Sequence, residues 1–288
     1  MLVEQTLLGV RNKVAIAIDR LQAFEPPEGY YLAFSGGKDS QCIYHLAQEA
    51  GVKFDAHYNI TGIDPPELFY FIRNNYPDVH RHLYKNSFFR LIEKKGLPTR
   101  MNRFCCERLK EHGGEGRICV TGVRWAESRS RATTRKPFEI VTHKKADKKL
   151  FNDNDQDRRL FETCTQKGKR VINPIIDWED SDVWEYLKSR NIKHCCLYDQ
   201  GFERLGCIGC PLSSNQEKEL LLYLQYADNY KRAIGRFLVG YLKRCEEQNR
   251  EPQFKTVEKM WDWWLYGKVK QKQCNGQMEM EDMGEGEE

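Results

Sequence analysis

The stretch from 33 to 40, with the sequence AFSGGKDS, carries the residue types of an anion-binding turn. Two adjacent glycines let the backbone take positive φ and bring its N–H groups close to a ligand. Lys38 supplies a positive charge for an anionic oxygen, and Asp39 can orient Lys38 or approach a magnesium ion. The pattern therefore predicts a phosphate site at the start of a helix. The expected contact residues are Ser35, Gly36, Gly37, Lys38, Asp39 and Ser40.

Eleven cysteines form a second group of candidate ligands. Cys105-Cys106 and Cys195-Cys196 are vicinal pairs, and Cys207 and Cys210 form a Cys-x-x-Cys pair. Four thiolates can close a metal site. Two adjacent cysteines cannot both bind one zinc ion without strain in the backbone, whereas a cubane cluster offers a separate iron to each thiolate. The residues therefore favour a [4Fe–4S] cluster over zinc, and their spacing does not choose between the two vicinal pairs.

A third motif, TGVRWAESR at 121–129, follows an apolar run that we predict to be a strand. Ligands of open α/β sheets bind at the carboxyl ends of the strands. Arg124 and Arg129 can clamp phosphate oxygens bidentately. We therefore expect both arginines to act at the phosphate site, with Gly122 beside the nucleotide.

The Ser-Gly-Gly-Lys-Asp-Ser string resembles the pyrophosphatase (PP) loop of the adenine nucleotide α-hydrolase superfamily, whose members cleave ATP between the α and β phosphates. The cysteine pattern and the GxRxxES segment resemble the phosphoadenosine phosphosulfate (PAPS) reductase family, in which a vicinal pair and a later CxxC hold a cluster. The stretch 194–202, HCCLYDQGF, also resembles that family's approach to its CxxC. The resemblance implies that the cluster ligands are Cys105, Cys106, Cys207 and Cys210.

The resemblance implies further roles outside these motifs. Thr61 and Gly62 are similar to the loop that contacts the nucleotide after the second strand of the family fold. Lys110 is similar to a family lysine that lies near the cluster and the anion.

Apolar periodicity predicts the elements that would position these residues. The alternation of strands and helices favours an α/β fold, a doubly wound parallel sheet with an N-terminal helix and a C-terminal helical extension. Residues 143–170 lack apolar periodicity and are expected to form a mobile surface loop or a short edge hairpin. The expected helices are 3–24, 40–50, 67–75, 182–190 and 212–265, and the expected strands are 30–34, 53–60, 79–83, 117–122 and 171–176. The expected regions are 1–28 (helix), 29–190 (nucleotide-binding domain), 191–270 (cysteine motif and helices) and 271–288 (acidic disordered tail).

The formal charge of +4 is unevenly distributed. Residues 276–288 hold six acidic side chains and no basic one, so the preceding chain carries +10. This surplus suits anionic ligands such as nucleotides and is compatible with DNA or RNA, without specifying either. No apolar run is long enough to span a bilayer or to form a signal-peptide core, so we expect a cytoplasmic protein without membrane contact.

Reductases of the family use a nucleophilic cysteine in a C-terminal Glu-Cys-Gly-Ile-His string, which this chain lacks, and Cys274 is the candidate nearest in position. The intact PP-loop instead favours a chain that splits ATP. Our leading hypothesis is an adenylating sulfurtransferase similar to DNA phosphorothioation enzymes and tRNA thiolases. It would use ATP, Mg²⁺ and the cluster, with a sulfur donor such as a cysteine desulfurase and DNA or tRNA as acceptor. The alternatives are a sulfonucleotide reductase that forms sulfite, and a nucleotide-binding subunit of a DNA- or RNA-modification complex that has no turnover alone.

Overall fold

The computed structural model describes residues 2–6, 9–85, 87–110, 113–142 and 147–273. The chain divides into two compact units. The first comprises Met1–Ile60, Asp64–Tyr84 and Leu109–Gly206, and the second comprises Thr61–Ile63, Lys85–Arg108 and the chain from Cys207 onward. Each unit is therefore assembled from segments that are far apart in the sequence.

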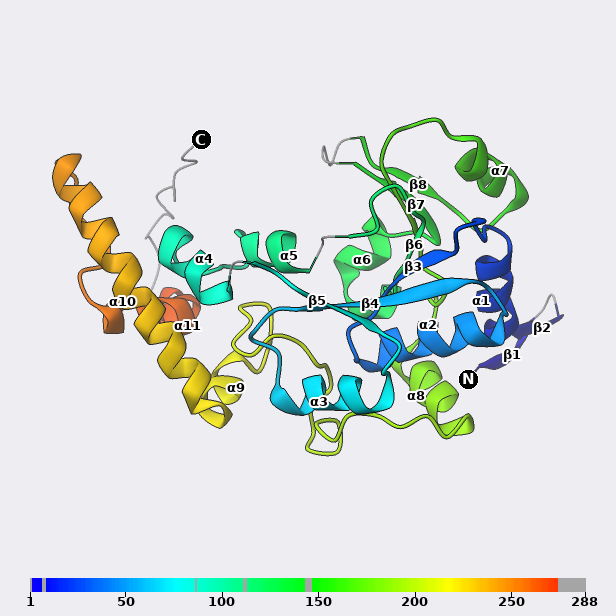
Figure 1. The fold of residues 1–288 in the computed structure, drawn as a ribbon, viewed down its shortest axis with the longest axis horizontal. Coiled ribbons are helices and arrows are strands. Elements are labelled where there is room, and N and C mark those ends of the chain that lie inside the picture. Colours follow the sequence, from blue (N-terminus) through cyan, green and yellow to red (C-terminus); the bar gives the residue numbers. More distant parts are fainter. Residues whose placement is uncertain (1, 7–8, 86, 111–112, 143–146, 274–288) are drawn as a thin grey trace. The chain divides into compact units, whose positions relative to one another are not determined.

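Seven strands form the central sheet of the first unit, in the order β5-β4-β3-β6-β9-β7-β8 (Figure 1). Strands β5, β4, β3, β6 and β9 run parallel, whereas β7 pairs antiparallel with both β9 and β8. The predicted α/β class is confirmed, and the sheet is mixed because the β7–β8 hairpin extends one edge. The strands are β3 (Tyr30–Ala33), β4 (Phe54–Ile60), β5 (His80–Leu83), β6 (Cys119–Val120), β7 (Phe138–Val141), β8 (Lys149–Phe151) and β9 (Lys169–Ile172).

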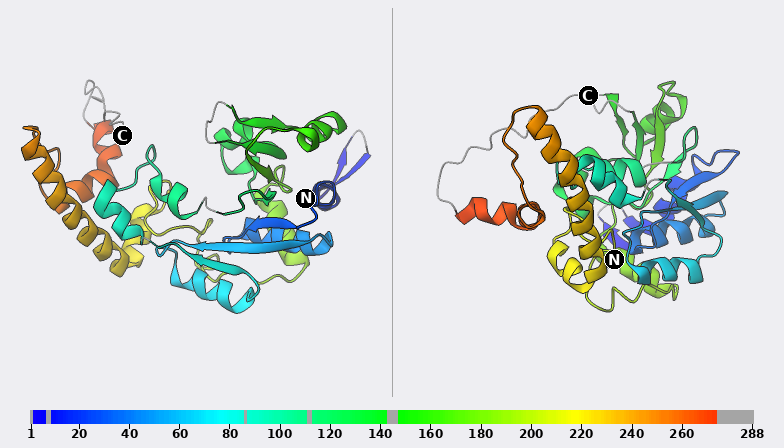
Figure 2. Two further views of the ribbon diagram at one scale, coloured as in Figure 1. Left: turned by 45° about the horizontal axis from the view of Figure 1, so that its top comes forward. Right: turned by 60° about the vertical axis from the view of Figure 1, so that its left-hand side comes forward.

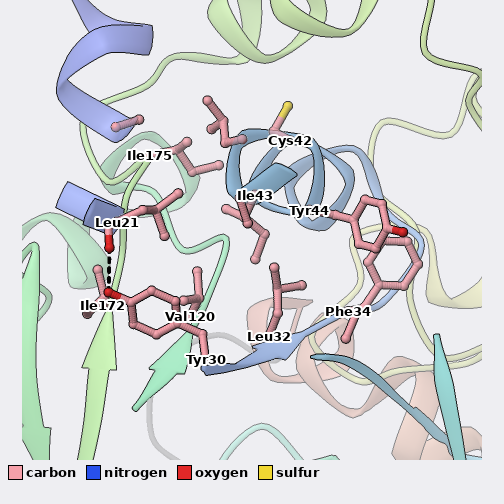
Figure 3. Close-up of a cluster of buried hydrophobic side chains, with 14 of the residues drawn as sticks. Leu21, Tyr30, Leu32, Phe34, Cys42, Ile43, Tyr44, Val120, Ile172 and Ile175 are labelled. Carbon is pink, nitrogen blue, oxygen red and sulfur yellow. Dashed lines mark hydrogen bonds between the residues drawn. The ribbon is translucent and has the colours of Figure 1, made fainter. Parts of the chain in front are cut away.

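Helices α1, α2 and α8 bury one face of this sheet. Leu32 of β3, Ile43 of α2 and Val120 of β6 are fully buried there (Figure 3). The Tyr30 hydroxyl donates to the Leu21 carbonyl over 2.6 Å, which satisfies a polar group inside this core. The helical elements of the unit are α1 (Lys13–Gln22), α2 (Lys38–Glu49), α3 (Pro66–Asn75), η1 (Trp125–Glu127), α6 (Arg129–Thr134), α7 (Asp155–Thr163) and α8 (Asp180–Ser189).

The N-terminal segment differs from the predicted helix over 3–24. Strands β1 (Val3–Thr6) and β2 (Gly9–Asn12) form an antiparallel hairpin, and the helix begins only at Lys13. The Asn12 side chain accepts hydrogen bonds from the amides of Val14 and Ala15 and so fixes the helix start. The apolar residues before Asn12 also fit a strand, because a short segment satisfies both periodicities.

The segment 143–170 also contains more structure than we predicted. Strand β8 confirms the edge-hairpin alternative, and α7 follows it, with the Asn154 side chain accepting from the amide of Asp157. Phe161 of α7 is fully buried against Phe24 and Phe138. A single buried aromatic thus anchors a helix whose other residues are mostly polar.

The second unit is helical. Helix α10 lies alongside α4 and also contacts α9 and α11 (Figure 2). Tyr230 of α10 is buried against Phe88 of α4 and Trp264 of α11. No helix in the described ranges is long and apolar enough to cross a membrane. The helices are α4 (Phe88–Lys95), α5 (Phe104–Leu109, which ends at the boundary of the units), α9 (Gln216–Leu222), α10 (Leu224–Glu247) and α11 (Val257–Gln273).

The limits of the two units differ from the predicted regions. Residues 191–206, which we grouped with the cysteine motif, belong to the first unit, and residues 85–108 belong to the second. Continuous ranges of sequence cannot describe these units, because the chain passes back and forth between two cores. Cys274 and the acidic tail lie outside the described residues.

Candidate functional site

A cavity of about 280 Å³ opens at the carboxyl ends of strands β3, β4 and β6. Ser35, Gly37, Asp39 and Ser40 of the predicted phosphate turn line it, as does Gly122. The cavity belongs entirely to the first unit. This position agrees with the rule that open α/β sheets bind ligands at the carboxyl edge.

Of the two glycines in the turn, the first takes positive φ and the second is extended, with a φ of −76°. Gly36 has a φ of +71°, and a Cβ there would lie 2.6 Å from Ile72 and 2.8 Å from Leu68. Helix α2 starts at Lys38, and its N-cap, Gly37, has no side chain that could accept from the first N–H groups. The Lys38 N–H already donates to the Tyr198 hydroxyl, and the N–H groups that follow it, with the positive end of the helix dipole, make this turn suitable for a phosphate group.

Lys38, however, does not line the cavity. Its Nζ donates to the Glu203 carbonyl over 2.9 Å and lies 3.6 Å from Asp180. Its backbone N–H donates to the Tyr198 hydroxyl over 2.8 Å. The charge that we assigned to the ligand is therefore held by neighbouring groups of the chain.

Arg124 is almost completely buried and ties the turn to α8. Its Nε donates to Asp39 over 2.6 Å, Nη1 donates to the Trp178 carbonyl over 3.1 Å, and Nη2 donates to Asp180. Burial raises the pKa of Asp39, and Arg124 and Lys38 oppose that rise. Arg124 thus orients Asp39, whereas we predicted that Asp39 would orient Lys38 or approach a magnesium ion and that Arg124 would clamp phosphate directly.

The second predicted arginine lies elsewhere. Arg129 begins α6, is exposed, and its side chain makes no hydrogen bond or ion pair with the described residues. Arg131 lines the cavity instead, paired with Glu127, whose carboxylate also lies 3.6 Å from Arg204. The spacing of Glu127 and Arg131, four residues apart, is the signal in the sequence that could have indicated this pair.

The loop after β4 is divided between the two units. Asp64 lines the cavity and accepts a hydrogen bond of 2.8 Å from the Tyr58 hydroxyl. Thr61 and Gly62, the predicted nucleotide contacts, belong to the second unit and do not line the cavity. Thr61 lies instead 3.7 Å from the Cys207 sulfur.

The cavity also extends along a polar face of the sheet that we did not predict. Tyr31 of β3 and His57 of β4 line it with their rings stacked 3.9 Å apart. Burial lowers the pKa of His57, although Asp55 opposes this effect. The hydrogen bond from Arg117 lowers the pKa of Asp55 to about 2. Lys110 and Lys169 add positive charge to the same cavity. Polar residues at every second position of β4 were the signal in the sequence.

The four predicted ligand cysteines all belong to the second unit. The hydrogen bond with Cys106 and then burial raise the pKa of the Cys105 thiol, and the proximity of Cys207 and Cys210 raises it further. The donor chemistry therefore fits a cluster, since thiols from two distant segments lie close enough for Cys207 and Cys210 to raise the pKa of Cys105. Within the described residues, no three His, Cys, Asp or Glu side chains are arranged to hold a single metal ion.

The rival vicinal pair belongs to the first unit. Cys195 is fully buried in its hydrophobic core, and Cys196 is exposed. Burial raises the pKa of Cys195 to about 11, which keeps it a thiol. The place of Lys110 beside a cluster stays a prediction, because Lys110 and the four cysteines lie in different units.

Comparisons with known proteins show which family the chain is similar to. The chain is 30% identical over 216 residues to an uncharacterized protein of Methanocaldococcus jannaschii, which covers 69% of this chain and 47% of that protein. It is also 30% identical over 214 residues to a probable FAD synthase of Schizosaccharomyces pombe, covering 70% of this chain and 69% of the synthase. A shorter match, 47% identical over 53 residues, covers 18% of this chain and 22% of an adenosine 5'-phosphosulfate reductase of Neisseria meningitidis. The chain thus spans less than half the length of the archaeal protein.

Among solved structures, the PAPS reductase of Candida auris matches with a TM-score of 0.45 and 16% identity, over 66% of this chain and 87% of that one. The FMN adenylyltransferase of Candida glabrata, in complex with FMN and an ATP analogue, matches with a TM-score of 0.43 and 14% identity, over 73% and 72% of the two chains. The family model described as the phosphoadenosine phosphosulfate reductase domain matches residues 29–213, which is more than half of the chain. The chain therefore belongs to the phosphoadenosine phosphosulfate reductase family.

Proposed function

We propose that this chain binds ATP in the cavity, cleaves it between the α and β phosphates to adenylate an acceptor, and transfers sulfur with the help of an iron–sulfur cluster. The observation that supports the ATP step is the glycine turn before α2, which lines the cavity and has no N-cap side chain to occupy the N–H groups that follow that of Lys38. Such amides bind the oxygens of a phosphate group without any change in the fold.

The loop amides would hold the β,γ-pyrophosphate, which gains negative charge as it leaves. Lys38 reaches that charge if its Nζ turns from the Glu203 carbonyl, where it now donates. Asp39 and Asp64 both line the cavity and are the residues that would supply oxygen ligands to Mg²⁺. Bound Mg²⁺ would neutralise the charge of the departing pyrophosphate.

The second unit would carry the sulfur chemistry. Cys105, Cys106, Cys207 and Cys210 would hold a [4Fe–4S] cluster, which would bind or relay sulfur. The sulfur would come from a donor such as a cysteine desulfurase, and DNA or tRNA would be the acceptor. Support for this step comes from the proximity of Cys207 and Cys210 to Cys105, whose pKa they raise.

Pyrophosphate release tests the ATP step. Purified protein is incubated with ATP and Mg²⁺, with and without tRNA, DNA and a sulfide source, and the products are identified by phosphorus NMR. We expect AMP and pyrophosphate as products. The rate of pyrophosphate release should fall at least tenfold in Lys38→Met and stay unchanged in the exposed control Lys53→Met. Absence of pyrophosphate under every condition would contradict the enzyme hypothesis.

Iron and sulfide analysis after anaerobic purification tests the cluster. We expect about four irons per chain, as a [4Fe–4S] cluster requires. The iron should be lost in Cys207→Ser and retained in Cys195→Ser, because Cys195 lies in the core of the other unit. Stoichiometric zinc in place of iron would contradict the cluster.

A sulfonucleotide reductase is the second candidate function. The match to the adenosine 5'-phosphosulfate reductase of Neisseria meningitidis favours it. This function predicts sulfite from adenylylsulfate or its 3'-phosphate, and loss of that activity in Cys274→Ser.

A further inference from the structure

Tyr198 brings a side chain from a distant segment to the backbone of the phosphate turn. Its hydroxyl accepts a hydrogen bond of 2.8 Å from the Lys38 N–H, the first amide of α2. A Cβ on Gly37 would lie 3.5 Å from the same oxygen. Tyr198 also lines the cavity. The hydroxyl is therefore placed beside the amides that are suited to a phosphate group.

The hydroxyl keeps a proton that it can donate. Burial raises the pKa of Tyr198, although the Lys38 amide opposes this effect. Because the oxygen already accepts from the Lys38 N–H, its own O–H points toward a different partner. Among the described residues, no carbonyl or carboxylate accepts that proton. A ligand oxygen in the cavity would supply the acceptor.

The ring of Tyr198 has little freedom to move away. It packs edge-to-face on Trp184 with ring centroids 5.0 Å apart, and Lys38 Nζ lies 5.8 Å from its centroid. The backbone forms a tight turn, in which the Tyr198 N–H donates to the Cys195 carbonyl and the Gly201 N–H donates to the Tyr198 carbonyl. The hydroxyl is thus held in place before any ligand arrives, which lowers the cost of binding.

We infer that Tyr198 binds the pyrophosphate portion of ATP, donating its O–H to a phosphate oxygen while it accepts from the Lys38 N–H. This inference rests on the proposed function, since it names a contact of the same nucleotide. The contact strengthens as negative charge builds on the leaving pyrophosphate. It does not involve the nucleoside or its α-phosphate, so AMP provides an internal reference.

The test compares Tyr198→Phe with the unchanged protein by isothermal titration with magnesium pyrophosphate, a non-hydrolysable ATP analogue and AMP. The phenylalanine retains the ring contact with Trp184 and removes only the hydroxyl. We expect pyrophosphate and the ATP analogue to bind about ten- to a hundredfold more weakly, as for loss of a hydrogen bond to a charged group, and AMP affinity to stay within about twofold. Tyr186→Phe is the matched control, because its buried hydroxyl contacts Glu49, 3.0 Å away, and does not line the cavity.

Each other result has a defined meaning. Equal weakening of AMP would indicate a structural role for Tyr198 and overturn the inference. Unchanged pyrophosphate affinity would also overturn it, and tighter pyrophosphate binding would show that the hydroxyl blocks the turn. If the unchanged protein binds neither pyrophosphate nor ATP, the proposed function fails and the inference fails with it.

A second variant covers the case in which Tyr198→Phe does not fold. Incorporation of 3-fluorotyrosine at position 198 retains the ring and the hydroxyl and makes the phenol a stronger donor. We expect tighter pyrophosphate binding with unchanged AMP affinity. Equal or weaker pyrophosphate binding would overturn the inference.

Discussion

Replacing Arg124 by methionine should destabilise the first unit more than replacement of any exposed arginine. The guanidinium is almost completely buried and donates to Asp39, Asp180 and the Trp178 carbonyl. Methionine has a similar volume but no donor. The substitution therefore leaves Asp39 as a largely buried carboxylate without its ion-pair partner.

The size of the stability loss in Arg124→Met follows from how deeply its three hydrogen-bond partners are buried. Removing one member of a buried ion pair costs about 3–5 kcal/mol. The Asp39 side chain is 23% exposed, which places its share toward the lower end of that range. The Asp180 side chain is 66% exposed, so its ion pair adds little. Including the unpaired Trp178 carbonyl, we expect a loss of about 3–4 kcal/mol in the free energy of unfolding.

The loss should depend on pH. Burial raises the pKa of Asp39 above its unfolded value, and Arg124 opposes that rise, so the variant raises the pKa further. An acid with a raised folded pKa contributes stability below its unfolded pKa and loses it as the pH rises through the folded pKa. Burial also acts to raise the pKa of Asp180, but Arg124 and Lys38 hold it below its ordinary value, and this stability disappears as the pH falls. The Asp39 effect makes the variant resemble the unchanged protein more closely at pH 4.5 than at pH 7.5, whereas the Asp180 contribution is lost only below that carboxyl's ordinary pKa of 3.8 and is the same at both pH values.

The assay is urea unfolding at both pH values, read by hydrogen exchange of peptides that cover β3 and α2. Local exchange is preferred because two units need not unfold in one step. Arg129→Met is the control, and we expect it to change stability by less than about 0.5 kcal/mol, as for an exposed residue whose side chain has no partner within the described ranges. A loss below about 1 kcal/mol in Arg124→Met, or a loss that grows toward acid pH, would refute this account of Arg124.

Three further predictions concern other parts of the fold. Gly36→Ala and Gly62→Ala both place a side chain at positive φ, but only the Cβ at Gly36 would meet the buried Ile72 and Leu68. In thermal unfolding, Gly36→Ala should therefore lose about 1–3 kcal/mol more of the free energy of unfolding than Gly62→Ala. Tyr230→Phe leaves the Ile208 carbonyl without the 2.9 Å hydrogen bond from the Tyr230 hydroxyl and should destabilise the second unit by about 1–3 kcal/mol in urea unfolding, whereas an unchanged midpoint would contradict this. The hydrogen bond from Arg117 lowers the pKa of Asp55 to about 2, so Asp55→Asn should cost about 1–2 kcal/mol at pH 7, after allowance for solvent, and the cost should vanish as the pH falls from 4 to 2 in a pH series of unfolding curves.

The glycine turn and the helix that follows it could be predicted from sequence because their signals are local. Glycine spacing, a preceding apolar run and a following helix pattern all lie within a few residues of Lys38. The parallel strands were predictable for the same reason, since buried strands are nearly continuous apolar runs. The N-terminal hairpin was not, because two four-residue strands are too short for their periodicity to differ clearly from a helix.

The partners of the turn could not be predicted, because they come from distant segments. Tyr198 and Glu203 reach Lys38 across about 160 positions of sequence, with separations of 160 and 165. The sequence showed that Arg124 would bring a positive charge to this region, but it did not show that this charge would be buried between two carboxylates. For the same reason the sequence did not distinguish Arg129 from Arg131. Local motifs indicate which atoms can act, and tertiary packing decides toward which partner each one points.

The interwoven course of the chain has a consequence for how this protein can be divided. The chain passes from one unit to the other after Ile60, Ile63, Tyr84, Arg108 and Gly206. No single cut in the gene therefore yields both units as continuous fragments. A truncation before Cys207 removes one cysteine pair but leaves Cys105 and Cys106 behind without the helices that complete their unit. A continuous fragment that carries every residue lining the cavity, from Tyr31 to Gly206, therefore always includes Cys105 and Cys106 of the other unit.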